Sequence, residues 1–359
     1  MRFRGQKKKT TVLTLVTALL VTVIACQSTP KAPQESESET SAALPGQGVS
    51  VRSANSGLLE AQFINEIFNI GLEQLGYKIE KPKVVDYTVM LITIANGDLD
   101  YTPSHAERLH IKFFKNAGGE EKLERVGTIY SPVLQGYKID KKTADQYNIT
   151  NLKQLQDPEI AQLFDSDGDG KANLTGCDPG WGCELVIEHQ LDAYRLRDTV
   201  EHDQGKYTAL IANTIARYRQ GESIFYHAWT PYWVASVLED GKDAVWLEVP
   251  FTSLPEAQGQ ITKEDTSVEG KNLGFAFDRV RIVANKAFLQ ANPAARRWFE
   301  LVEIPTTDIN TESLRIHNGQ DRPEDIRRHA VEWVKNHQAQ FDSWLEEASK
   351  AEKDFNSNF

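Results

Sequence analysis

Apolar residues recur first at strand spacing and then at helical spacing where the folded part of the chain begins. The run VSVRSA (49–54) predicts a β-strand. The stretch SGLLEAQFINEIFNIGLEQLGY (56–77) predicts an amphipathic helix, with these residues near one face: Leu58, Phe63, Ile67, Ile70 and Leu75. The run YTVMLITIANGD (87–98) is predicted to form a strand and a turn. This β-α-β order predicts an α/β fold with largely parallel sheets.

A second series of alternating segments starts near Asp140. Strand patterns occur at 223–229 and at the start of 280–288, which continues as a helix. Helical patterns cover 148–164, 187–196, 205–222, 292–302 and 323–348. No repeat of fixed period is present, and two α/β lobes fit the length better than one very large sheet.

The C-terminal part predicts one charged helix from Glu324 to Lys353 with a single buried face. We expect its inward residues to be Ile326, Val331, Trp333, Val334, Phe341, Trp344 and Leu345. Trp246 and Trp298 also occur at strand or helix periodicity, so we expect them to pack in the interior.

The N-terminus has the pattern of an export signal. MRFRGQKKKT has five basic residues and no acidic one, and the apolar run from Val12 to Ala25 is short for a membrane span. The run ends in Val23-Ile24-Ala25-Cys26, which resembles the lipobox of bacterial lipoproteins. We therefore expect residues 1–25 to be a signal peptide and Cys26 to be lipidated. The alternative is an ordinary signal peptide with an incidental cysteine.

The predicted domain organisation follows from a change in composition. Residues 26–43 are rich in Ser, Glu and Pro and contain no aromatic residue, so they predict a flexible tether. Residues 44–145 and 279–359 are expected to form lobe 1, and residues 146–278 are expected to form lobe 2. The protein would be held at a membrane by its lipid, in the periplasm or at the cell surface, and we expect a monomer.

The chain has three cysteines, and two remain if Cys26 is lipidated. Because export leads to an oxidising compartment, we predict a disulfide between Cys177 and Cys183. The formal net charge of −11 argues against a nucleic-acid partner, since no basic face is available to neutralise phosphates. No catalytic or nucleotide-binding motif occurs in its required context, so we do not expect an enzyme.

The heptapeptide CDPGWGC (177–183) places the two cysteines around one tryptophan, Trp181. A helical pattern follows at once, so the amides of Gly182 and Cys183 should lie at a helix N-terminus. Free amides at that position attract a carboxylate or a phosphate. The loop can therefore present an aromatic face beside an anion site.

A second aromatic group, FYHAWTPYW (225–233), follows the predicted strand at 223–229. Trp229 and Trp233 lie where the strand leaves the sheet, which is a common place for ligand contacts in open α/β folds. The alternative is that these aromatic residues are part of the core. Aromatic walls beside carboxylate-binding amides suit a zwitterion with a quaternary ammonium group, which cation–π attraction holds by ~0.5 to 2 kcal/mol per ring.

Three stretches resemble the periplasmic glycine betaine/proline betaine-binding proteins of bacterial osmoprotectant ABC importers. They are residues 140–184, which include CDPGWGC, residues 225–234 (FYHAWTPYWV) and residues 281–288 (RIVANKAF). The resemblance extends from about Leu44 to Ala348. It implies a two-lobed, type II periplasmic-binding-protein fold that closes on its ligand. It also implies delivery of the ligand to an ABC permease and ATPase complex.

The resemblance also implies the site. Trp181 and Trp229 match two walls of a three-tryptophan cage, and the family's disulfide corresponds to Cys177–Cys183. His110 matches a histidine that holds the ligand carboxylate, together with the amides of Gly182 and Cys183.

The segment HAERLH (105–110) departs from the family, because Ala106 stands where the third cage tryptophan would be. Either Tyr101 or another aromatic residue substitutes, or the cage is open on one side and accepts a bulkier ligand. The segment also adds polar residues that the family lacks, namely His105, Glu107 and Arg108. A second alternative is a sensor of the same fold that signals ligand state to a partner.

The stretch DSDGDGKANLTG (165–176) begins like a calcium loop, with Asp165, Asp167 and Asp169 at the right spacing. Its twelfth position is Gly176, where the loop normally needs a bidentate glutamate. We therefore expect a turn network and no cofactor, with a structural calcium as the alternative. The six histidines outside 105–110 show no metal-ligand spacing.

Overall fold

The computed structural model describes residues 43–357, with side chains as far as Ala351. The predicted signal peptide, Cys26 and almost all of the predicted tether lie outside these residues. The described part belongs to one compact unit, Ala43–Phe359. Within it, no helix is long and apolar enough to cross a membrane.

The main strands form one mixed sheet of seven strands, in the order β5-β13-β6-β9-β7-β8, with β10 paired to β6. The strands of this sheet are β5 (Tyr101–Ala106), β6 (Leu123–Asp140), β7 (Ala172–Thr175), β8 (Val200–Asp203), β9 (Phe225–Thr230), β10 (Ala244–Trp246) and β13 (Asp278–Asn285). Three short pairs complete the strands: β1 (Ser50–Val51) with β3 (Lys78–Ile79), β2 (Ala54–Asn55) with β4 (Lys83–Val84), and β11 (Ser267–Val268) with β12 (Lys271–Asn272).

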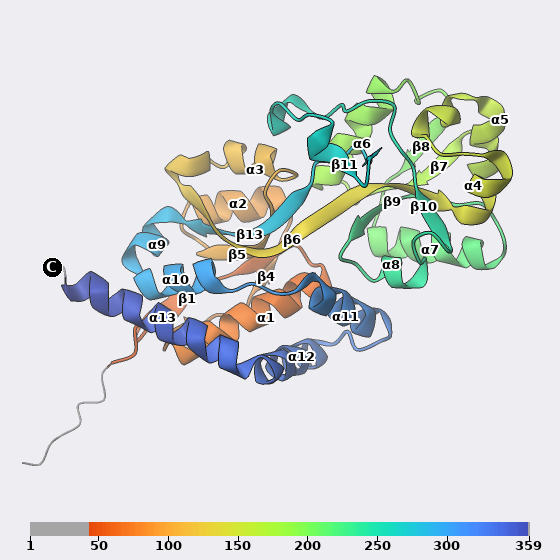
Figure 1. Cartoon of the computed structure of the whole chain (residues 1–359). Helices are drawn as coiled ribbons and strands as arrows, with labels where there is room; N and C mark the ends of the chain where they lie inside the picture. The colour runs from red at the N-terminus through yellow and green to blue at the C-terminus, as the bar shows by residue number, and fades with distance from the viewer. Residues whose placement is uncertain (1–42, 358–359) are drawn as a thin grey trace, which may run out of the picture. The chain divides into compact units, whose positions relative to one another are not determined.

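The expectation of mostly parallel sheets is wrong, although the α/β class is confirmed. β6 pairs antiparallel with β13, β9 and β10, and β13 pairs antiparallel with β5. The parallel pairs in this sheet are β7 with β8 and β7 with β9. The β-α-β pattern did not predict the antiparallel pairs. The strand β6 is 18 residues long, passes through the whole molecule and has antiparallel neighbours on both sides (Figure 1).

Helices cover the sheet at both ends of β6 (Figure 1). They are α1 (Leu59–Gln74), α2 (Tyr87–Ala95), α3 (Ile111–Asn116), α4 (Lys141–Tyr147), α5 (Pro158–Ala161), α6 (Gly182–Ala193), α7 (Tyr207–Arg219), α8 (Val234–Val237), α9 (Lys286–Ala291), α10 (Pro293–Leu301), α11 (Thr306–His317), α12 (Pro323–Asn336) and α13 (Gln338–Ser357). Single 3-10 turns occur at Gly119–Glu121, Leu152–Gln156, Gln162–Phe164, Glu256–Gln258 and Glu264–Thr266.

Two groups of buried residues form the core. One combines α1, α2 and α10–α13 with β5, β13 and the first half of β6. The other combines α6 and α7 with β7, β9 and the second half of β6, where Tyr137 and Ile139 are buried. The predicted lobe boundaries at 145/146 and 278/279 stay a prediction.

The predicted helix at 56–77 is confirmed as α1, whose Ile67 and Phe68 are fully buried. The helix packs closely on α10: a Cβ on Gly71 would lie 2.0 Å from the Trp298 ring. The predictions for α7, β9, α10 and the β13–α9 unit are confirmed as well.

The predicted strand at 87–98 is wrong, since Tyr87–Ala95 form α2. Met90, Leu91 and Ile94 are buried, whereas Val89 and Ile92 are exposed. This is helical spacing, which a continuous apolar run conceals. The run is rich in β-branched residues and so favoured a strand, but packing of one helical face decides the conformation.

Two other helix predictions need correction. Residues 148–164 form short turns rather than one helix, because Asn151 and Asp157 each start a new turn with a side-chain cap. The predicted helix 324–353 is divided at His337 into α12 and α13, and Val331 is half-exposed rather than buried.

Candidate functional site

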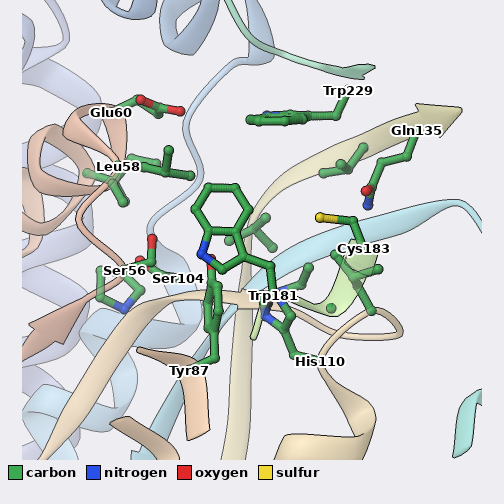
Figure 2. Close-up of a pocket in the computed structure, with 18 of the residues that line it drawn as sticks. Ser56, Leu58, Glu60, Tyr87, Ser104, His110, Gln135, Trp181, Cys183 and Trp229 are labelled. Atoms are coloured by element: carbon green, nitrogen blue, oxygen red, sulfur yellow. Dashed lines mark hydrogen bonds between the residues drawn. The ribbon is translucent and has the colours of Figure 1, made fainter. Parts of the chain in front are cut away.

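A cavity of about 740 Å³, including space open to solvent, lies where α1, α2, β5, β6, α6 and β9 meet. All five residues predicted to bind a ligand line it, namely Trp181, Trp229, His110, Gly182 and Cys183 (Figure 2). The structure therefore brings together residues that are distant in the sequence.

Trp181 lies at the N-cap of α6, immediately before Gly182. Its ring packs edge-on against Trp229, with centroids 6.2 Å apart and planes at 67°. Tyr87 of α2 meets the same ring at 6.5 Å and 80°. Trp181 therefore forms a corner of aromatic faces with residues from both cores.

Trp229 is held by two tyrosines behind it. Tyr232 stacks on it with centroids 4.4 Å apart, and Tyr207 lies at 4.5 Å. Trp233, the other tryptophan expected at this strand end, does not line the cavity, because it is buried and stacks on His317 at 3.6 Å. The turn after β9 directs the side chain of Trp233 toward α11, which carries His317.

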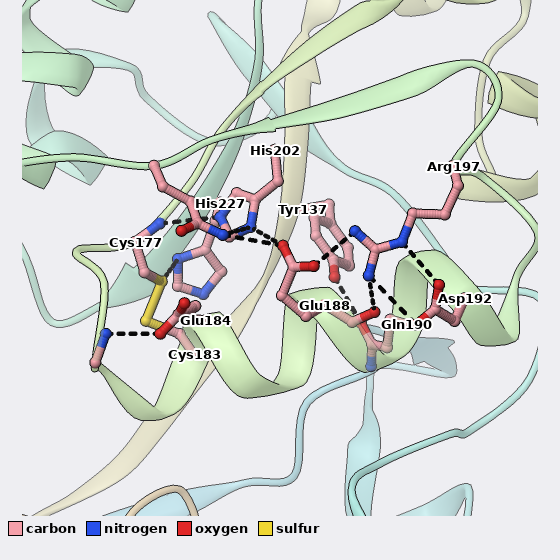
Figure 3. A network of polar contacts seen from close by, with 12 residues as sticks. Tyr137, Cys177, Cys183, Glu184, Glu188, Gln190, Asp192, Arg197, His202 and His227 are labelled. Atoms are coloured by element: carbon pink, nitrogen blue, oxygen red, sulfur yellow. Dashed lines mark hydrogen bonds and ion pairs between the residues drawn. A yellow bond between two sulfur atoms is a disulfide. The ribbon is translucent and has the colours of Figure 1, made fainter.

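The predicted disulfide between Cys177 and Cys183 is formed. Hydrogen bonds hold the same loop from outside (Figure 3): the Cys177 amide donates to His202 Nε2 at 3.4 Å, and His202 Nδ1 bonds Glu188 at 2.7 Å. Nε2 accepts, so His202 carries its proton on Nδ1. The Gly180 amide donates to Glu184 at 2.6 Å. These bonds tie the loop to α6, which it precedes.

Asp178 ties the loop to a second helix. Its carboxylate accepts from the Tyr207 amide and from Lys206 Nζ, both at 2.7 Å. Because Tyr207 is the first residue of α7, this carboxylate also satisfies a free helix amide. The loop around Trp181 is therefore fixed to α6 and α7 together.

The start of α6 approaches the segment after β5 very closely. A Cβ on Gly182 would lie 2.7 Å from the Leu109 carbonyl oxygen and 3.1 Å from His110 Cδ2. Only glycine permits this distance without movement of the backbone. The approach places the first amides of α6 beside the imidazole of His110.

His110 is poised as a neutral donor. Its Nδ1 accepts a hydrogen bond from the Ala106 amide at 3.1 Å, so the proton resides on Nε2. Burial lowers the pKa of His110 to about 3, which keeps the ring uncharged near neutral pH. Tyr87 covers it with ring centroids 3.8 Å apart.

The segment 105–110 is held by Asp278 at the start of β13. This carboxylate accepts from the amides of Arg108 at 3.0 Å and Leu109 at 2.8 Å. Burial raises the pKa of Asp278 to about 6, although these hydrogen bonds lower it. Asp278 thus positions the backbone that carries His110.

The other polar side chains of this segment do not line the cavity. Glu107 pairs with Arg279 and Arg281, and Arg108 pairs with Asp265. His105 is buried outside the cavity. The expected polar character of 105–110 is therefore directed away from the site, because each charge has a partner elsewhere.

Ala106 lines the cavity, but Tyr101 does not replace the missing ring. Tyr101 is fully buried, and its hydroxyl bonds Asn69 at 3.0 Å. Tyr87 and Tyr130 line the cavity instead. Tyr87 was not predicted as a site residue, because residues 87–98 were expected to form a strand and a turn.

Glu60, Ser104 and Gln135 also line the cavity and were not predicted. Glu60, in the first turn of a charged amphipathic helix, has the pattern of a solvated residue. Ser104 lies on β5, a strand that was not predicted from the residue pattern. No local motif identifies any of the three.

The Asp165–Gly176 loop forms the expected turn network. Asp165 accepts from the amides of Gly168 at 2.7 Å and Gly170 at 2.9 Å, and these bonds lower its pKa. Ligand atoms of Asp165, Asp167 and Asp169 lie within 4.8 Å of one another, outside the cavity. The prediction that this turn network holds no cofactor and its alternative, a structural calcium at this loop, both stay untested.

Comparison with known proteins identifies the family. The model for the substrate binding domain of ABC-type glycine betaine transport systems, OpuAC, matches residues 49–336. The chain belongs to the OpuAC family. The glycine betaine-binding periplasmic protein OusX of Dickeya dadantii is 50% identical over 311 residues, which are 86% of this chain and 93% of that protein. The glycine betaine/proline betaine-binding periplasmic protein of Escherichia coli is 48% identical over 310 residues, with the same coverage.

Solved structures of OpuAC-like proteins share the fold. A glycine betaine, L-proline-binding protein of Borrelia burgdorferi matches with a TM-score of 0.66 at 18% identity, over 84% of this chain and 99% of that one. Lactococcal OpuAC, closed on glycine betaine, matches with a TM-score of 0.62 at 18% identity, over 83% and 99%. The predicted two-lobed fold and family resemblance are confirmed, and the family is one of binding proteins rather than enzymes.

Replacing both Cys177 and Cys183 with alanine should lower the free energy of unfolding by about 2 kcal/mol, the entropy expected for so small a ring. The fold should persist, because Asp178, Glu184 and His202 still hold the loop. Urea unfolding followed by circular dichroism measures the change. Dithiothreitol should destabilise the natural protein and leave the double variant unchanged; equal sensitivity of both would contradict the prediction.

Proposed function

We propose that this protein is the extracytoplasmic substrate-binding protein of an ABC transporter for a quaternary ammonium solute of the glycine betaine/proline betaine class. It would deliver this solute to a permease and ATPase complex. The observation that carries the proposal is one cavity with aromatic faces beside a helix N-terminus and a neutral histidine donor. The names of the relatives, which include periplasmic glycine betaine-binding proteins, support it.

The aromatic end suits a trimethylammonium group. Such a cation has no N–H to donate, so ring faces are its natural partners. Trp181, Trp229 and Tyr87 present rings from two cores to one space. Each well-placed ring contributes about 0.5 to 2 kcal/mol.

The opposite end suits a carboxylate. The amides of Gly182 and Cys183 begin α6, a helix of 12 residues whose dipole favours an anion there. His110 Nε2 adds a donor from the other core. A betaine would bridge the two ends with its two charged groups.

Ligand binding would hold the lobes together. Contacts between the lobes include the approach of Gly182 to Leu109 and the stack of Trp233 on His317. Two polar contacts of partly exposed groups add to them: Arg108 with Asp265 at 3.1 Å, and Lys115 Nζ with the Ala257 carbonyl at 3.1 Å. Exposed ion pairs contribute about 0 to 1 kcal/mol, too little to fix closure alone. The ligand's contacts with both lobes would shift the population to the closed form that the permease recognises.

A ligand bulkier than glycine betaine is the alternative. Ala106 leaves one wall of the cavity without a large side chain, which favours the same transport role for a bulkier quaternary ammonium compound as the second candidate.

We further propose that Cys26 is lipidated and anchors a monomeric protein to a membrane, in the periplasm or at the cell surface. The lipobox-like Val23-Ile24-Ala25-Cys26 supports the anchor.

Calorimetric titration with glycine betaine, proline betaine, choline and carnitine tests the function. We expect micromolar or tighter binding of at least one of them. Replacing Trp181 with alanine should weaken it about 30-fold, the upper end of ~2 kcal/mol for one ring. Trp246→Ala, at a half-buried tryptophan outside the cavity, is the control and should bind normally. Absence of binding to all four would refute the proposal.

Replacing Gly182 with alanine should weaken binding about tenfold, because the new methyl group keeps the two walls of the cavity apart. Alanine suits a helix, so stability should not fall. Gly205→Ala is the matched control, since its Cβ would be 3.5 Å from the nearest atom. Titration gives the affinity, and small-angle X-ray scattering with ligand measures closure. Unchanged affinity and closure would show that this approach is not part of the bound form.

Replacing Cys26 with serine should abolish lipid attachment. The natural protein should incorporate labelled palmitate in a bacterial host and partition into detergent, whereas the variant should do neither. A variant that still partitions into detergent would contradict the lipid anchor at Cys26.

A further inference from the structure

Glu60 is a buried carboxylate that faces the cavity without a charged partner. It is the second residue of α1 and is only 8% exposed. Among the side chains that the structure describes, residues 43–351, no lysine, arginine or histidine forms an ion pair with it. Its own backbone amide favours the charged form, but burial outweighs this effect and raises the pKa. A buried carboxylate normally has a partner, so this one needs an explanation.

The surroundings of Glu60 are uncharged. Tyr87 from α2, Tyr130 from β6 and Tyr232 after β9 face it, and burial raises the pKa of each. His110 lines the same cavity but is neutral, as shown above. Ionised Glu60 would therefore be the single full charge of this cavity among the described residues.

Glu60 lies on the side of the cavity that would receive the positively charged end of the ligand. It lies on the far side of Trp181 from His110, toward Trp229 (Figure 2). His110 and the α6 amides serve the carboxylate end of a zwitterion. The side of the cavity where Glu60 lies is thus the aromatic side that suits the cation.

We propose that Glu60 determines specificity by supplying the counter-charge for the ligand's quaternary ammonium group. The inference rests on the proposed function, and it states that the cavity selects a positively charged group. A trimethylammonium group placed among these rings would offset the unpaired carboxylate. A ligand of the same shape without the positive charge would gain no attraction from Glu60 and would bind more weakly.

The proposal predicts proton release on binding. Burial raises the pKa of Glu60 to about 7, so a large fraction of it is protonated in the free protein at neutral pH. A bound cation favours the ionised form and lowers this pKa. The complex therefore holds fewer protons than the free protein, and affinity must rise with pH. Each unit by which the ligand lowers the pKa gives about a tenfold range in affinity.

A charge-swap experiment separates this role from a structural one. Glycine betaine is compared with 3,3-dimethylbutanoate, which has the same shape but a carbon in place of the charged nitrogen. Glu60→Gln should weaken glycine betaine about tenfold and should strengthen 3,3-dimethylbutanoate, as measured by competition or direct titration. Weakening of both ligands, or of neither, would overturn the proposal. The variant keeps the size of the side chain and removes a buried charge, so it should fold.

A pH series provides an independent readout. Natural protein should bind glycine betaine about tenfold more tightly at pH 8 than at pH 5.5, and calorimetry in two buffers at pH 7 should show proton release. Glu60→Gln should show neither effect. Asp278, whose pKa is about 6, also titrates in this window. Proton release that persists in Glu60→Gln would assign the effect to Asp278 and overturn the proposal.

The two hypotheses fail differently. If no ligand of the class binds natural protein at any pH, the proposed function is wrong. If glycine betaine binds natural protein and Glu60→Gln equally at every pH, the function stands and the role of Glu60 is refuted.

Discussion

The close approach of Gly182 to the Leu109 carbonyl is the contact on which the site depends. It joins the first turn of α6 to the segment after β5, and a side chain as small as a methyl group would prevent it. Through it, the amides of one core and the imidazole of the other converge on one space. Helix dipole, donor geometry and aromatic faces become a binding site only because this glycine allows the two cores to meet.

Both sides of the contact between Gly182 and Leu109 are held rigidly, which keeps the binding groups in place. The loop around Trp181 is fixed by the disulfide, by His202 and by Asp178, and the facing segment is fixed by Asp278. The contacts are backbone amides bonded to buried or half-buried side chains, which hold geometry better than exposed ion pairs do. The same bonds determine tautomers: His202 accepts through Nε2 and His110 accepts through Nδ1. His110 therefore offers Nε2–H to the cavity as a donor that does not depend on pH near neutrality.

The sequence predicted the parts of the fold and site that local pattern determines. Trp181, Gly182 and the disulfide follow from CDPGWGC, and α1 follows from its apolar spacing. The mixed sheet was not predictable in this way, because strand direction depends on how the long strand β6 recruits partners far away in the chain. Tyr87 was missed because an apolar run fits both helix and strand. Glu60 was missed because only tertiary packing turns the first turn of α1 toward the cavity.

Glu60 would add to the cavity a means of recognition that its aromatic faces lack. A ring contributes about 0.5 to 2 kcal/mol and acts equally at every pH. A buried carboxylate is attracted to a cation over a longer distance, but its ionisation in a dry cavity is unfavourable until that cation arrives. Recognition by Glu60 would thus couple ligand charge to proton loss, which aromatic faces cannot do. Glu107 and Arg108 have partners outside the cavity, so Glu60 is the acidic side chain that would carry this coupling among the described residues lining the cavity.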